Sequence, residues 1–342
     1  MSYSAYSLFR RVRLRLGALA LGGLAVGCGG SNPLAPTTDG VPAGDSLAAP
    51  AVPTDSTVMP PDSSLIGPNA LTGGAPGIVF GTFDLDLALL GPLYTGALRL
   101  PTPYTLPFNL ADARSKGARL VLRLSGSESN IKNADGTFSY TKWKAMVDRF
   151  KSANFTSYIT DGTVLGHYLI DEPYRAARWG GKTISQATIE QMAQYSKQLW
   201  PGMTTFVRAP PSWLAGSTIT YTYLDAGWAQ YASYQGNVTT WITAEAAKAK
   251  AKGLGLMVGA NVLNGGNGSS GIHGTERGKY AMSATELRTY GTALLSQPLA
   301  CGWFTWSYLY IGKTYFARAD IKSAMTDLSN QAKAHVKTPC FQ

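Results

Sequence analysis

The stretch "TVLGHYLIDEP", residues 163–173, decides the fold. It predicts a buried strand, and a continuous apolar strand is typical of a parallel sheet that is covered on both faces. Two carboxylates, Asp171 and Glu172, end the run directly before Pro173. Neighbouring like charges repel each other, so the pair belongs either to an active site or to a capped turn after the strand.

Similar runs recur along the chain and alternate with helical patterns. The other predicted strands are 77–83, 95–100, 118–126, 204–210, 221–231, 254–266 and 300–310. Helices are predicted at 106–116, 139–153, 184–200, 238–253, 283–297 and 317–336. Eight such units in about 265 residues predict a single α/β domain, a (β/α)8 TIM-type barrel over 78–342. A doubly wound sheet is the alternative, but "GTFDLD" after the first strand is not its Gly-rich phosphate loop.

Residues 1–77 predict an export signal followed by a tether. Four arginines precede eleven apolar residues, Leu16 to Val26, which are too few to span a bilayer stably. "LAVGCGGS" then resembles the lipobox of bacterial lipoproteins, although Ala25 stands where leucine is usual. The resemblance implies a signal peptide at 1–27, a lipid anchor on Cys28, and a place on the periplasmic or outer cell surface of a membrane. An ordinary signal peptide with a chance cysteine is the alternative.

The segment 28–77 is rich in Pro, Gly, Ser, Thr and Ala and has no aromatic residue, which predicts a flexible tether. Lipidation of Cys28 would leave Cys301 and Cys340 in an oxidising compartment. These two could form a disulfide between the last strand and the C-terminal tail. Two buried free thiols would fit the sequence equally well.

Composition limits the function classes. The 342 residues are 45% hydrophobic and 15% charged, which suits a globular domain with a sizeable core. The formal net charge is +10, and residues 78–342 carry about all of it. A basic domain could favour acidic polymers or anionic lipid heads, although a solvated basic surface is the plainer interpretation.

The sequence lacks the motifs of several classes of functional site. No basic run interleaved with aromatics predicts nucleic-acid binding. No histidine pair or C-x-x-C predicts a metal site, and no G-x-S-x-G predicts a serine hydrolase. We therefore expect neither a metal nor a cofactor.

Polar and aromatic residues stand at the predicted strand ends, where barrels place their functional groups. Carboxylates and amides hydrogen-bond sugar hydroxyls, and aromatic faces stack on sugar rings, so the set predicts a carbohydrate cleft. Its members are Asp84, Asp171, Glu172, Arg208, Asp225, Trp228, Asn261, Asn264 and Trp306.

The motif "LIDEPY" at the fourth strand resembles the corresponding strand end of retaining glycoside hydrolases with (β/α)8 barrels. In that superfamily a Glu followed by Pro is the general acid/base, a role that the resemblance implies for Glu172. Asp171 stands where the family usually has Asn. An aromatic residue within "WFTWSY" of the eighth strand also fits the family's sugar platform.

The seventh strand departs from that family. It ends "GANVLNGGNGSS", so Asn261 and Asn264 stand where the family places a Glu nucleophile. Asparagine has no anionic oxygen to attack a sugar, and Glu276 in the following loop is a distant substitute. An inverting mechanism is the other option, with Glu172 as acid and Asp225 or Asp171 activating water.

Two functions follow from this departure. The chain is a membrane-tethered hydrolase of a polysaccharide or oligosaccharide, or it is a barrel that has lost catalysis. In the second case it binds glycans or serves as an accessory subunit of a membrane protein complex. If the acidic pair is only a capped turn, we expect it to pair with Arg175, Arg178 or Arg208.

Overall fold

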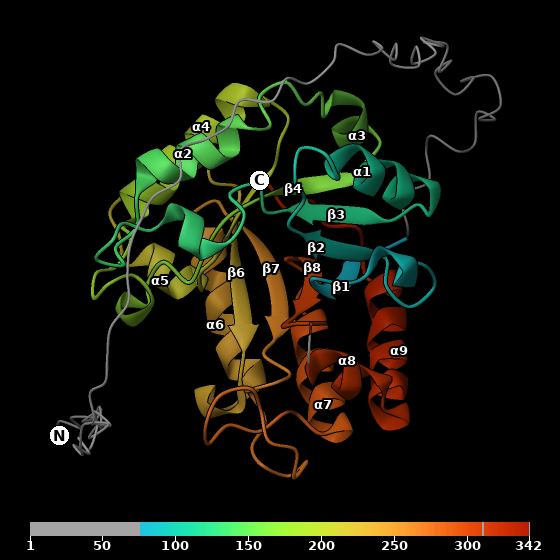
Figure 1. Ribbon diagram of the computed structural model, residues 1–342. Helices are drawn as coiled ribbons and strands as arrows, with labels where there is room; N and C mark the ends of the chain where they lie inside the picture. Colours follow the sequence, from blue (N-terminus) through green and yellow to red (C-terminus); the bar gives the residue numbers. More distant parts are fainter. Residues whose placement is uncertain (1–75, 310, 342) are drawn as a thin grey trace, which may run out of the picture. The chain divides into compact units, whose positions relative to one another are not determined.

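The computed structural model describes residues 76–309 and 311–341. The predicted signal peptide, the lipidation site Cys28 and almost all of the tether lie outside these residues. Within them, eight parallel strands pair in chain order and close into a barrel (Figure 1), which confirms the predicted fold. The strands are β1 Val79–Phe83, β2 Gly96–Arg99, β3 Arg119–Leu122, β4 Val164–Asp171, β5 Thr205–Arg208, β6 Ala226–Tyr231, β7 Gly255–Ala260 and β8 Ala300–Thr305.

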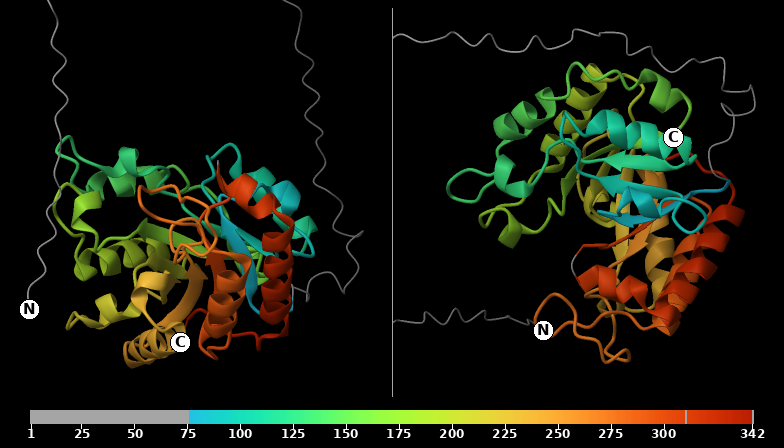
Figure 2. Two further views of the ribbon diagram at one scale, coloured as in Figure 1. Left: turned by 90° about the horizontal axis from the view of Figure 1, so that it is seen from below. Right: turned by 45° about the vertical axis from the view of Figure 1, so that its right-hand side comes forward.

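Helices follow most strands and lie outside the barrel in each view (Figure 2). They are α1 Leu106–Ser115, α2 Tyr140–Asp148, α3 Thr156–Thr160, α4 Gln186–Leu199, α5 Pro211–Ala215, α6 Val238–Ala251, α7 Ala284–Leu295, α8 Ile311–Ala317 and α9 Ala319–Ala334. The sequence does not predict α3, α5 or α8, because five to seven residues are too few to show a helical period. No helix of the described part is long and apolar enough to cross a membrane.

The core has two layers, which follow from the alternation of side chains along each strand. One layer fills the barrel lumen and includes Phe83, Tyr168, Phe206, Trp228, Met257 and Phe304. The other lies between strands and helices and includes Trp143, Ile189, Ile242, Leu287 and Leu328. Both layers consist almost wholly of fully buried apolar side chains, so the barrel is a packed scaffold and not a pore.

His167 belongs to the outer layer. It stacks on Trp143, and its Nδ1 lies 2.9 Å from the Ser196 hydroxyl in α4. Complete burial lowers the pKa of His167 to about 3, so this imidazole is neutral in the folded state. It is a core residue of the helix–strand interface and takes no part in the barrel mouth.

The C-terminal tail lies against the amino-terminal ends of β7 and β8. Cys340 forms a disulfide with Cys301 of β8, and both sulfurs are buried with the lumen residues. Phe341 also pairs with Leu254 at the start of β7. The tail therefore lies at the end of the barrel opposite the carboxyl ends of the strands, attached beside β7 and β8.

Candidate functional site

The acidic pair lies at the carboxyl end of β4. The backbone N–H of Glu172 donates to the carbonyl of Arg208 in β5 at 3.0 Å, which extends the strand pairing by one residue. Glu172 has φ of 43°, and Asp84 after β1 has φ of 56°. These are the two non-glycine residues with positive φ in the described chain, and such backbones cost about 1–3 kcal/mol and gather at functional sites. Both are carboxylates at the barrel mouth.

Asp171 is fully buried and forms ion pairs with two arginines. Its Oδ1 accepts hydrogen bonds from the Tyr168 hydroxyl at 2.8 Å and from Arg208 Nε, and its Oδ2 lies 2.7 Å from Arg178 Nη2. Burial alone would raise the pKa of Asp171, but the charges of Arg208 and Arg178 outweigh it and hold the pKa at about 2. The role of Asp171 as a water-activating base stays a prediction, and the 1% exposure of its side chain and its pairing with arginines do not favour that role.

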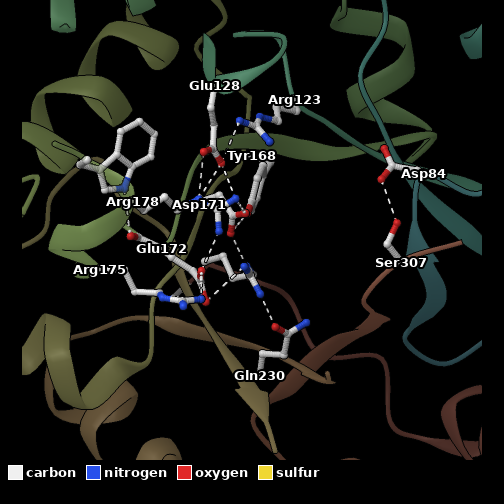
Figure 3. A network of polar contacts seen from close by, with 12 residues as sticks. Asp84, Arg123, Glu128, Tyr168, Asp171, Glu172, Arg175, Arg178, Gln230 and Ser307 are labelled. Carbon is white, nitrogen blue, oxygen red and sulfur yellow. Dashed lines mark hydrogen bonds and ion pairs between the residues drawn. The ribbon is translucent and has the colours of Figure 1, made fainter. Parts of the chain in front are cut away.

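Glu172 is surrounded by cations (Figure 3). Its Oε2 lies 2.8 Å from Arg175 Nη1 and 2.6 Å from Arg178 Nη1, and its Oε1 lies 3.3 Å from Arg208 Nη2. The Tyr174 hydroxyl also donates to Oε1 at 3.3 Å. All the ion pairs expected of a capped turn are thus present, but they line an open pocket.

Arg178 ties this network to the loop after β3. Its Nε donates to both carboxylate oxygens of Glu128, at 2.8 and 2.9 Å. Glu128 in turn lies 3.7 Å from Arg123 Nη2. The Trp179 indole donates to the carbonyl oxygen of Glu172 at 3.1 Å, so the backbone of that residue is held as well as its side chain.

A pocket of about 280 Å³ opens beside Glu172, and we call it the mouth pocket. Three polar atoms of its walls have no hydrogen-bond partner in the described chain: Trp228 Nε1, Gln230 Nε2 and Asn261 Oδ1. All three atoms are buried behind the pocket surface, so they are polar groups that the fold leaves unsatisfied next to the pocket. The pocket is lined by Glu172, Tyr174, Arg175, Arg208, Pro210, Trp228, Gln230, Ala232, Tyr234, Gln235, Asn261, Asn264, Glu276 and Lys279.

The loop between β7 and α7 forms one wall of the mouth pocket. Asn264 holds it: its Oδ1 accepts from the backbone N–H groups of Thr275 at 2.7 Å and of Glu276 at 3.0 Å. Its Nδ2 donates to the Thr275 hydroxyl at 2.7 Å. Asn264 was predicted as a substrate ligand, but its side-chain amide forms hydrogen bonds with the loop. The loop in turn places Glu276 in the pocket that Glu172 also lines.

Asp225 is not at this end of the barrel, and the prediction that it is catalytic is wrong. β6 begins at Ala226, so Asp225 precedes the strand and lies at its amino-terminal end. Its carboxylate accepts from the Thr205 backbone N–H at 2.8 Å and pairs with Lys197 Nζ at 2.7 Å. The error arose because the predicted strand started five residues early, which moved Asp225 toward the wrong end.

The other predicted residues divide between the pocket and its surroundings. Arg208, Trp228 and Asn261 line it, Trp228 as a buried residue that also packs in the lumen. Trp306 does not line it, but its ring lies 5.4 Å from the Arg208 guanidinium. Asp84 accepts a hydrogen bond from the Ser307 hydroxyl at 3.1 Å, apart from the Asp171 network (Figure 3). Burial raises the pKa of Asp84.

Several lining residues were not predicted. Gln230 is two residues after Trp228 in β6, so the two side chains share a face, and it lies one residue before the strand ends. Tyr234 and Lys279 lie in loops after β6 and β7, and no periodic pattern in the sequence marks them. Among the described residues, no group of three His, Cys, Asp or Glu side chains could hold a metal ion.

Comparison with known proteins shows a shared fold. No family model matches the chain, and no curated protein matches it. Among solved structures, a β-glucanase from Saccharophagus degradans has a TM-score of 0.52 at 10% identity, covering 78% of this chain and 96% of the glucanase. A β-D-glucuronidase from Dictyoglomus thermophilum has a TM-score of 0.49 at 12% identity, covering 78% of this chain and 52% of the glucuronidase.

This chain therefore spans about half the length of the glucuronidase. At these identities the likeness concerns the fold alone. The chain is structurally similar to the TIM barrels of glycoside hydrolases.

Proposed function

We propose that this protein binds a poly- or oligosaccharide in the mouth pocket. The observation that carries the proposal is the pocket itself: at the carboxyl ends of β4 to β7 it joins carboxylates, amides and aromatic rings. Trp228 Nε1, Gln230 Nε2 and Asn261 Oδ1 lack partners beside the pocket, and a sugar hydroxyl would satisfy them after a small shift of the side chains that bury them. Membrane tethering through Cys28 and a role in a membrane complex remain parts of this proposal.

Binding is favoured over hydrolysis by the state of Glu172. Both of its carboxylate oxygens contact cations. A glycosidic oxygen that approached this carboxyl would compete with Arg175, Arg178 and Arg208 for its two oxygens. A general acid must lie within hydrogen-bond reach of the oxygen that it protonates.

Hydrolysis is the second candidate because Glu276 lines the same pocket as Glu172. Glycoside hydrolysis needs two carboxyls that flank one bond, and no Glu stands at the end of β7 itself. The loop that Asn264 holds supplies a carboxylate from that side of the barrel. In this version Glu172 serves as general acid and Glu276 as its partner.

One experiment separates the candidates. The full chain is titrated calorimetrically with a panel of oligosaccharides, and each mixture is then examined for cleavage products. Binding without cleavage supports the first candidate. Cleavage that falls about 100-fold or more in both Glu172→Gln and Glu276→Gln supports the second. Asp327→Asn, which removes a surface ion pair of α9, is the control and should change neither readout. If no oligosaccharide binds or is cleaved, the proposed function is wrong.

A further inference from the structure

The charges of the mouth pocket are unequally paired. Its two carboxylates, Glu172 and Glu276, face three cations, Arg175, Arg208 and Lys279. Arg208 is occupied by Asp171 and Glu172. No ion pair formed within residues 76–309 and 311–341 involves Lys279, whose ammonium lies 5.2 Å from the centroid of the Tyr234 ring. Glu276 likewise takes part in no ion pair among these residues, so Lys279 and Glu276 are the charged lining residues without one, and the lining has one more cation than carboxylates.

The backbone around Lys279 is fixed in the folded protein. The N–H of Gly274 donates to the carbonyl of Lys279 at 2.8 Å, and the N–H of Lys279 donates to the carbonyl of Glu276 at 3.1 Å. The next residue, Tyr280, pairs with Gly266 and stacks on His273. Only the side chain of Lys279 would lose freedom on binding an anion, which keeps the entropic cost of binding small.

Arg175 offers a second cationic group at the same rim. Its side chain is 50% exposed, and one guanidinium nitrogen, Nη1, contacts Glu172. A guanidinium has five N–H donors in a planar fork, and Nη1 to Glu172 is the one side-chain hydrogen bond that Arg175 makes within the described residues. The Glu172 carboxylate also pairs with Arg178 and Arg208, so it neutralises the charge of Arg175 only in part.

We infer that the mouth pocket takes an acidic glycan, one whose sugar carries a carboxylate or a sulfate group. Lys279 and Arg175 bind the anionic group, and the ring of Tyr234, which is 75% exposed, packs on the sugar. Charge-assisted hydrogen bonds are about twice as strong as neutral ones, so the acid group would add affinity that a neutral sugar lacks. The inference rests on the proposed function and names its substrate class.

The test compares three hexasaccharides that share one sugar backbone and differ in their acid group. The full chain is titrated with a galacturonate hexasaccharide, with its carboxyl-reduced neutral form, and with a sulfated derivative of the neutral form. We expect at least one acidic form to bind about tenfold more tightly than the neutral form. Lys279→Gln should remove that preference, whereas Lys322→Gln, the same charge change on exposed α9, should keep it. The carboxylated and sulfated arms distinguish the two acid groups.

Two results would overturn the inference and leave the proposed function standing. In the first, the neutral hexasaccharide binds as tightly as both acidic forms. In the second, Lys279→Gln and Lys322→Gln weaken acidic binding equally, which would show a general electrostatic effect of the basic surface and no local site. If none of the three ligands binds and no oligosaccharide of the wider panel binds or is cleaved, both the proposed function and the inference are wrong.

Discussion

Asp171 is the residue on which the mouth network depends. It is fully buried and pairs with Arg208 and Arg178, so replacing it removes the most buried carboxylate that these guanidiniums share. Breaking a buried ion pair from one side typically costs about 3–5 kcal/mol. We expect Asp171→Asn to lower the free energy of unfolding at pH 7 by about this amount, as measured by urea denaturation.

The pH dependence gives that prediction a second check. The pKa of Asp171 is lowered from 3.8 to about 2 in the folded protein. Its stabilisation is therefore complete above the unfolded-state pKa and is lost as pH falls through about 4 toward 2. The stability difference between wild type and Asp171→Asn should shrink in that window. A difference that stays constant from pH 7 to pH 3 would contradict the network described above.

Burial of His167 should make the free energy of unfolding depend on pH in a second, higher range. The pKa of His167 is lowered from 6.5 to about 3 in the folded protein. Below pH 6.5 the imidazole therefore binds a proton in the unfolded chain but stays neutral in the folded chain. Stability should fall by up to about 1.4 kcal/mol per pH unit from this group alone as pH drops from 6 to 4. His167→Gln should flatten that part of the stability curve. An unchanged slope would mean that the imidazole is not held neutral.

At the scale of elements, the loop between β7 and α7 determines which groups meet at the mouth. Asn264 makes its only side-chain hydrogen bonds in the described chain to Thr275 and Glu276. We expect Asn264→Ala to expose the amides of residues 275 and 276 to rapid hydrogen exchange while α7 and α9 stay protected. Asn133→Ala, in the loop after β3, is the matched control. Slow exchange at 275 and 276 in the Asn264 variant would refute this anchoring role.

The strands and helices were easier to predict from the sequence than the residues of the mouth pocket. The eight strands and six longer helices could be predicted because their apolar periods are long enough to read. The site could be predicted only in part: the acidic pair, Arg208, Trp228 and Asn261 follow from strand ends. Asp225 was misplaced because one strand boundary was wrong, and Tyr234, Glu276 and Lys279 reach the pocket through loops. Loop paths depend on tertiary hydrogen bonds such as those of Asn264, which leave no periodic signal.

At the scale of the whole molecule, the disulfide ties the tail to the barrel. Cys301 and Cys340 are separated by 39 residues, and cross-linking a loop of that length stabilises a domain by about 3–4 kcal/mol in the chain-entropy model. The double variant Cys301→Ser/Cys340→Ser should lower the denaturation midpoint accordingly, and a reducing agent should lower that of wild type to the same value. Equal midpoints for oxidised and reduced wild type would contradict a stabilising role.

The central claim is that the mouth pocket binds a glycan, and a pair of tyrosines tests it most directly. Tyr234 lines the pocket and is 75% exposed, whereas Tyr104 is 78% exposed and does not line it. Both can be replaced by alanine with little effect on the core. The measurement is the calorimetric affinity of wild type, Tyr234→Ala and Tyr104→Ala for the oligosaccharide that wild type binds best. We expect an affinity about tenfold weaker for Tyr234→Ala and unchanged for Tyr104→Ala. Equal affinity in all three proteins, or no binding by wild type, would contradict it.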